Sequence, residues 1–150
     1  MDYMKDKYPA LFVLLEKRLE LAGRYLGLTE KQEDAIAADD DAALLELLEE
    51  RESLAKEIDG ANREAEAALR EYRSFSENGS GTVEAETLIE RTRELYVKCL
   101  TLDRKNAKEI KSQMAKASGD SRELQKRREG INKYAQADYI FAPSILDKRQ

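Results

Sequence analysis

The chain has 150 residues, of which 38% are charged and 41% hydrophobic, and its formal net charge is −5. It contains no His and a single Cys, Cys99. Without His there is no Ser-His-Asp triad, no Cys-His pair and no imidazole metal ligand, and one thiol forms neither an internal disulfide nor a thiolate zinc cluster. Glycine-rich phosphate loops and EF-hand patterns are also missing. We therefore expect a protein that is not an enzyme and needs no cofactor or metal.

The residue usage favours long helices. Ala, Glu, Leu, Lys and Arg dominate, with only two Pro and seven Gly, and this composition is typical of extended helical proteins. No run approaches 18 apolar residues, and the sequence begins with alternating charges and no long apolar core of a signal peptide. We expect a soluble, cytoplasmic, all-α protein with a single domain.

Two turn-like stretches divide the chain into three helical segments. Residues 76–82 read Ser-Glu-Asn-Gly-Ser-Gly-Thr, and residues 37–41 read Ala-Ala-Asp-Asp-Asp, in which an Asp side chain can cap a helix. We therefore expect helices over about 8–37, 41–75 and 83–118.

Apolar residues recur at steps of three and four in the first two segments without a slip. A repeat of 3.5 residues sustained over such lengths indicates left-handed coiled-coil packing. The stripes are broad enough for each helix to contact two neighbours, so the predicted fold is an antiparallel three-helix coiled-coil-like bundle. Gly23 and Gly27 could permit a close helix approach or mark a kink, but the heptad phase runs through both, so we expect the first helix to be continuous. The stripe of the second segment includes one charged residue and reads Leu44, Leu47, Arg51, Leu54, Ile58, Ala61, Ala65, Ala68, Tyr72 and Phe75.

The third helix is expected to be extended. It runs parallel to the first, whose roughly 45–52 Å length ends opposite residue 118. Near this point Gly119 could end a helix and Asp120 could cap a new one. We expect the helix to continue or restart over 121–134, an irregular tail over 135–150, and both to extend beyond the bundle.

This C-terminal part differs from the body in charge and in its apolar residues. Residues 104–133 carry a net charge of +6, whereas residues 1–103 carry −11. The basic residues could pair with the acidic body, dock an acidic protein or contact nucleic acid. We expect no nucleic-acid partner, because the chain as a whole is acidic and has no recognition module. The tail contains an apolar cluster that either caps the end of the bundle or binds a client, and it comprises Tyr139, Ile140, Phe141, Ile145 and Leu146.

Four features together resemble the FlgN-like flagellar export chaperones. They are the opening helix over residues 11–36, the acidic break at 39–41 followed by the leucine-rich stretch 44–51, a long third helix, and a tail in which Tyr134 precedes the ending 145–148, Ile-Leu-Asp-Lys. The resemblance covers nearly the whole chain.

The resemblance implies a chaperone for exported flagellar proteins of the hook–filament junction type. Such a protein would bind a helical segment of its client with the end of the third helix and the tail, and would deliver the client to the export apparatus. The implied client contacts are Leu124, Ile131, Tyr134, Tyr139, Phe141 and Ile145, joined by the basic Lys126, Arg127 and Arg128 and the neighbouring Ile140 and Leu146. The alternative is a structural coiled-coil scaffold, and the heptads also permit a helix-swapped homodimer.

Overall fold

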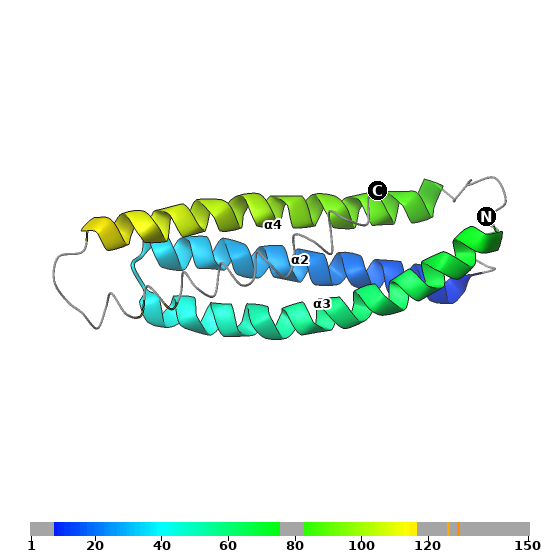
Figure 1. The fold of residues 1–150 in the computed structure, drawn as a ribbon, viewed down its shortest axis with the longest axis horizontal. Coiled ribbons are helices and arrows are strands. Elements are labelled where there is room, and N and C mark those ends of the chain that lie inside the picture. The colour runs from blue at the N-terminus through cyan, green and yellow to red at the C-terminus, as the bar shows by residue number, and fades with distance from the viewer. Residues whose placement is uncertain (1–7, 76–82, 117–125, 127–128, 130–150) are drawn as a thin grey trace.

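A computed structural model of the chain describes residues 8–75, 83–116, 126 and 129. Three long helices account for most of these residues, α2 (Pro9–Ala37), α3 (Asp41–Phe75) and α4 (Val83–Lys116). Figure 1 shows the helices side by side, with α3 antiparallel to both α2 and α4. The protein is an all-α antiparallel three-helix bundle, as the heptad stripes predicted.

The helices begin and end within two residues of the expected ranges. Pro9 opens α2 at a position where its missing N–H leaves no helical bond unmade. α4 has 34 residues, more than the 29 of α2 and about as many as the 35 of α3. Residues 117–125, where the third helix was expected to continue or restart, lie outside the described residues. None of the described helices has a stretch long and apolar enough to cross a membrane.

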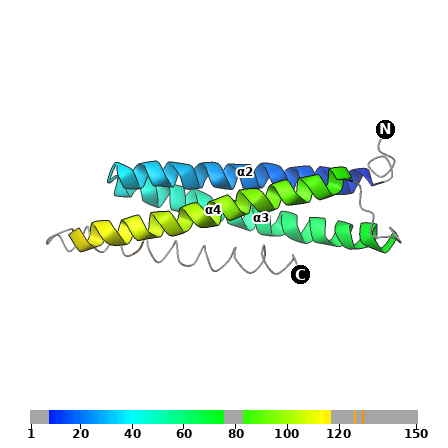
Figure 2. The same cartoon turned by 90° about the horizontal axis from the view of Figure 1, so that it is seen from above.

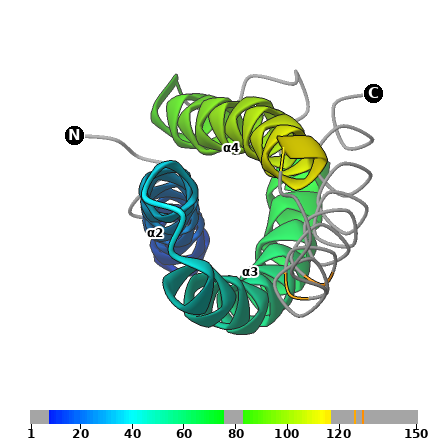
Figure 3. The same cartoon turned by 90° about the vertical axis from the view of Figure 1, so that its left-hand side faces the viewer.

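α2 is the central helix of the bundle. Viewed along the bundle, α2 lies between α3 and α4 (Figure 3), and Figure 2 shows α4 running obliquely across the other two helices. Cα atoms of α2 come within 8 Å of both neighbours, whereas among the described residues no Cα pair between α3 and α4 is that close. α3 and α4 therefore meet through side chains only.

Three core clusters fill the bundle from end to end. The first lies where α2 begins and includes Phe12, Leu15 and Tyr72, all at most 2% exposed. The second lies at mid-length and contains the buried Cys99, as expected for a lone thiol on the apolar face. The third lies where α2 ends and brings Ile110 of α4 against both other helices. Each cluster draws on all three helices.

The turn between α2 and α3 uses a local backbone motif. The N–H of Asp40 donates to the carbonyl of Ala35 at 2.9 Å and that of Asp39 donates to Ile36 at 3.1 Å, a pairing that satisfies the last carbonyls of α2. Asp39 takes a left-handed conformation with φ of 57°. The Asp40 carboxylate then accepts a hydrogen bond from the N–H of Ala43 at 3.1 Å. The predicted capping role of an Asp in this stretch is confirmed for Asp40.

We expect Asp40→Ala to lower the free energy of unfolding by about 0.5–2 kcal/mol, because the substitution removes the side-chain acceptor of the α3 N-terminus. Urea denaturation at pH 7 measures the change. Glu49→Ala is the matched control, since it removes an exposed carboxylate from the same helix without a capping role. Equal losses in the two variants would contradict the capping contribution.

Candidate functional site

Of the residues predicted to bind a client, the structure describes one, Lys126. Its side chain is exposed, and it contributes to the lining of a small hollow at the end of the bundle. The other residues of that hollow are Ile36, Asp41, Leu44, Leu45, Ile110 and Gln113. The remaining predicted contacts lie outside the described residues, and they are Leu124, Arg127, Arg128, Ile131, Tyr134, Tyr139, Ile140, Phe141, Ile145 and Leu146.

The position of Lys126 corrects the expectation of a straight overhang. A helix continuing along the α4 axis from Ile110 would carry Lys126 about 24 Å further on. Instead Lys126 shares a hollow with Ile110 and with Leu44 and Leu45 of α3. The prediction that this part of the chain extends beyond the bundle is therefore wrong at Lys126.

The second half of α4 carries a row of exposed basic side chains near this hollow. Its ammonium and guanidinium groups point away from the core, and one of them, Lys105, pairs with Glu33 of α2 at 2.8 Å. This hydrogen bond to Glu33 raises the pKa of Lys105. The row can attract carboxylates from a partner, and its members are Arg104, Lys105, Lys108, Lys111 and Lys116.

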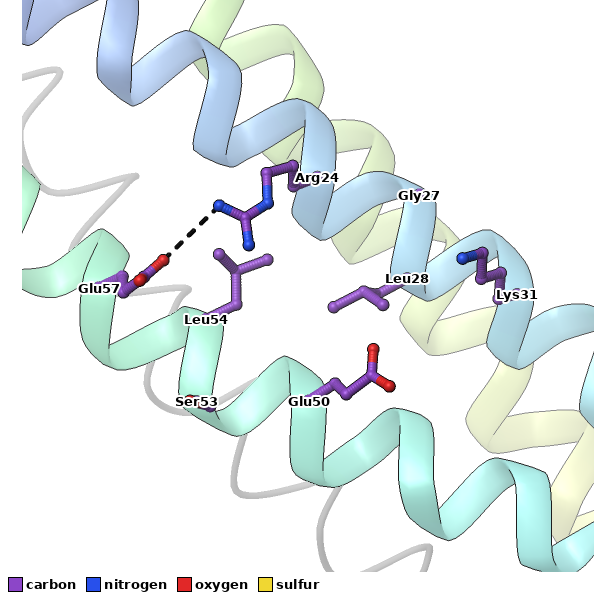
Figure 4. Close-up of a pocket in the computed structure, with 8 residues that line it drawn as sticks. All are labelled: Arg24, Gly27, Leu28, Lys31, Glu50, Ser53, Leu54 and Glu57. Atoms are coloured by element: carbon purple, nitrogen blue, oxygen red, sulfur yellow. Dashed lines mark ion pairs between the residues drawn. The ribbon is translucent and has the colours of Figure 1, made fainter.

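A groove of about 540 Å³ runs between α2 and α3 on another face of the bundle. Leu28 and Leu54 point into it from opposite sides (Figure 4), and Arg24 reaches across to Glu57 at 3.7 Å. Lys31 of α2 and Glu50 of α3 add a further cation and anion. Because cations line one wall and anions the other, the groove has no net charge to select a small ionic ligand.

The two glycines of α2 are not required for helix packing. A Cβ atom at Gly23 or Gly27 would meet nothing within 4 Å apart from the helix itself and the adjoining residues. α2 is also continuous through both positions. The prediction that the first helix runs unbroken through both glycines is therefore confirmed.

We expect Gly27→Ala to raise the free energy of unfolding by about 0.5–1 kcal/mol, because Ala costs less conformational entropy in a helix interior. Gly23→Ala should act similarly, and thermal denaturation of both variants measures the gain. A loss of stability in Gly27→Ala would show that the groove between α2 and α3 has less room than its geometry indicates.

A buried polar layer joins all three helices at mid-length. Arg51 of α3 forms an ion pair with Asp103 of α4, and their side chains are 1% and 5% exposed. The Arg51 guanidinium lies over the Tyr25 ring, 5.0 Å from its centroid, and donates to the Thr29 hydroxyl at 3.5 Å. Asn106 of α4 donates to the Thr29 carbonyl at 3.4 Å. The long arginine side chain therefore fills the space between α3 and α4 that no close backbone approach occupies.

A second arginine enters the interior nearer the beginning of α2. The Nε of Arg18 donates to the Asn62 side chain at 2.9 Å. Burial lowers the pKa of Arg18, and the neighbouring Tyr96 and Glu66 oppose that shift. Burial likewise raises the pKa of Tyr96. Polar groups from the three helices thus specify which side chains face one another at two levels of the bundle.

The sequence contains a signal for the first of these layers. Arg51 occupies the apolar stripe of the second segment and Asp103 that of the third. Opposite charges within two apolar stripes predict a buried pair when the helices are antiparallel and the two positions fall at the same level. The Arg18–Asn62 bond has no comparable signal, because Arg18 lies beside the stripe.

The thiol of Cys99 lies near the Arg51–Asp103 pair. Burial raises its pKa to about 12, Asp103 adds to this shift and Arg51 opposes it. The thiol is therefore protonated and unreactive at neutral pH. This environment does not suit a nucleophile or a redox-active cysteine.

We expect the free energy of unfolding to decrease as the pH rises above about 9. Between that pH and 12 the Cys99 thiol ionises in the unfolded chain but stays protonated in the folded one, so alkali favours unfolding by up to about 1.4 kcal/mol per pH unit for this group. Tyr96 shifts in the same direction. Urea denaturation from pH 8 to 10.5 measures the slope, and Cys99→Ala should reduce it. An unchanged slope in Cys99→Ala would contradict the assignment of this pH dependence to Cys99.

Among the described residues, no group of three or more Cys, Asp or Glu side chains is placed to hold a metal ion. Comparisons with protein-family models, with curated proteins and with solved structures find no match.

Proposed function

We propose that this protein is a chaperone for exported flagellar proteins of the hook–filament junction type, and that it binds a helical client segment through its C-terminal part. The observation that carries the proposal is the resemblance of the sequence to the FlgN-like family. The all-α bundle is compatible with that family's expected fold. The proposal also includes a cytoplasmic location and the absence of catalytic activity.

The proposed mechanism is folding of the client on binding. A disordered client segment would become helical and bury its apolar face against Leu124, Ile131, Tyr134 and the apolar residues of the tail. Such burial keeps the client soluble and prevents premature assembly. Arg127 and Arg128, together with the exposed basic row of α4, would attract an acidic client and accelerate its encounter.

The experiment combines the full-length protein with a hook–filament junction protein of the same organism. Size-exclusion chromatography with light scattering shows whether a stable heteromer forms, and stopped-flow fluorescence gives its association rate at several salt concentrations. We expect Ile131→Asp to abolish the heteromer while the circular dichroism spectrum stays helical. Homo-oligomers without any heteromer would overturn the proposal in favour of a coiled-coil scaffold.

The electrostatic part has its own matched pair of variants. Arg127→Glu with Arg128→Glu should slow association at least tenfold at low salt and flatten its salt dependence. Arg63→Glu with Arg70→Glu reverses two exposed charges on α3 and should change the rate far less. Equal effects from the two double variants would show that net charge alone controls the encounter.

A further inference from the structure

The side of the bundle where α3 faces α4 differs from the other two helix pairings. Among the described helices, close backbone approach occurs only between α2 and each of its neighbours. We call the side between the other two helices the α3–α4 flank and define it by Leu45 and Leu48 of α3 and Leu100 and Asp103 of α4. Arg51 fills this space at the level of Asp103, and elsewhere side chains on this flank would be open to solvent unless something covers them.

Leu100 is buried although it points away from the central helix. Lys105 faces α2, because it pairs with Glu33, and Leu100 lies about 140° around α4 from Lys105 at 100° per residue. Leu100 is only 7% exposed and belongs to none of the three core clusters of the described residues. A group outside those clusters therefore covers it.

The α3 side of the flank begins at the edge of the core. Leu48 is 4% exposed and belongs to the third core cluster, together with Ile110 of α4. Leu45 lies one residue beyond the core residue Leu44, where a surface position would be expected, but it is half-buried. Leu45 lines the same hollow as Lys126, so the C-terminal part of the chain reaches this flank.

The two described residues of the C-terminal part show which side of it faces the bundle. Lys126 and Glu129 are both helical and both exposed. On a helix through these residues, Leu124 and Ile131 fall on the opposite side, since they are offset by about 140–200° from Lys126 and Glu129. A helix whose exposed side carries Lys126 and Glu129 would therefore turn Leu124 and Ile131 toward the bundle.

Charge complementarity supports the same placement. Glu52, Asp59 and Glu66 follow Leu48 by 4, 11 and 18 residues and therefore lie on its side of α3. A segment that starts at Lys126 beside Leu45 and runs parallel to α3 places Lys133 level with Glu52. Lys133 follows Lys126 by seven residues, as Glu52 follows Leu45. Residues 121–134 carry five basic and two acidic side chains, which suits this acidic row.

We propose that the α3–α4 flank is a docking surface for the C-terminal segment of the same chain, residues 121–134, which lies along it as a fourth helix. Leu124 and Ile131 supply its buried face, and its basic residues meet the acidic row of α3. The inference concerns the free chain and does not depend on the proposed client, which would have to compete for the same apolar face.

Hydrogen exchange of the full-length protein, read by mass spectrometry, tests this placement. We expect amides of residues 124–133 to exchange at least tenfold more slowly than an unstructured chain, at a rate independent of protein concentration. Leu100→Glu should remove most of this protection. Val97→Glu is the control, because Val97 lies on the same helix and is already 37% exposed, and it should change the exchange less than twofold.

A second pair of variants covers the case in which Leu100→Glu unfolds the bundle. Glu52→Lys with Asp59→Lys alters only exposed residues and should accelerate exchange over 124–133 several-fold, and adding Lys133→Glu should reverse part of that change. Unprotected amides over 124–133 in the unsubstituted protein would overturn the proposal. Protection that grows with protein concentration would overturn it too, because the occupant would then be a second copy.

Discussion

Arg51→Ala is expected to destabilise the protein by about 3–5 kcal/mol, which is the cost of leaving one member of a buried ion pair without its partner. Arg51 and Asp103 are almost fully buried, so water cannot replace the lost guanidinium. The same substitution removes the contact with the Tyr25 ring and the hydrogen bond to Thr29. Urea denaturation at pH 7, followed by circular dichroism at 222 nm, measures the loss.

The double variant Arg51→Met with Asp103→Leu separates the charge from the volume. Both replacements fill similar space without a charge, so we expect the double variant to be far more stable than Arg51→Ala, within about 2 kcal/mol of the unsubstituted protein or above it. A double variant as unstable as Arg51→Ala would show that the hydrogen bonds of the layer, and not the unpaired charge, determine its contribution. Sedimentation of the double variant would also show whether the buried pair specifies a single oligomeric state.

Phe12→Ala is expected to cost about 3–5 kcal/mol, the usual loss when a large buried aromatic side chain leaves a cavity. Phe12 is 2% exposed and packs in the cluster that also holds Leu15 and Tyr72. This cluster lies at the end of the bundle where α2 begins, and the edge-to-face contact of Tyr8 with Tyr72, at 5.6 Å between ring centroids, covers the same region. Thermal and urea denaturation measure the loss.

The neighbouring Val13 supplies the control for this cavity. Its side chain is 63% exposed, so Val13→Ala removes little buried surface and should change stability by less than about 0.5 kcal/mol. The comparison holds helix position and backbone constant while burial differs. Similar losses in Phe12→Ala and Val13→Ala would mean that helix propensity, and not packing, dominates at this end of α2.

Prediction from the sequence succeeded where the information is local. The heptad stripes identified the helices and their buried faces, and the run of three Asp residues identified the cap that Asp40 provides. Cys99 was correctly placed in the core. Each of these features depends on residues within one or two turns of helix, and hydrophobic periodicity and capping encode them directly.

Prediction was weaker wherever a residue meets a distant one. The client-binding residues stay a prediction, since only Lys126 among them is described, and its place beside Ile110 and Leu45 replaces the expected overhang. A run of apolar positions indicates that one face of a helix is buried, but it does not indicate which element covers that face. The sequence therefore did not determine the direction that the chain takes after α4.

The sequence by itself determined that this chain is helical, where its first two helices begin and end, where the third begins, and which face of each is apolar. Only the tertiary structure decided that α2 is the central helix, that Arg51 reaches Asp103 across the bundle, and that Lys126 returns to the side of α3. The physical reason is the range of the interactions. Helix formation and capping follow from neighbours along the chain, whereas the choice of partners depends on side-chain volumes and charges that come together only when the helices pack.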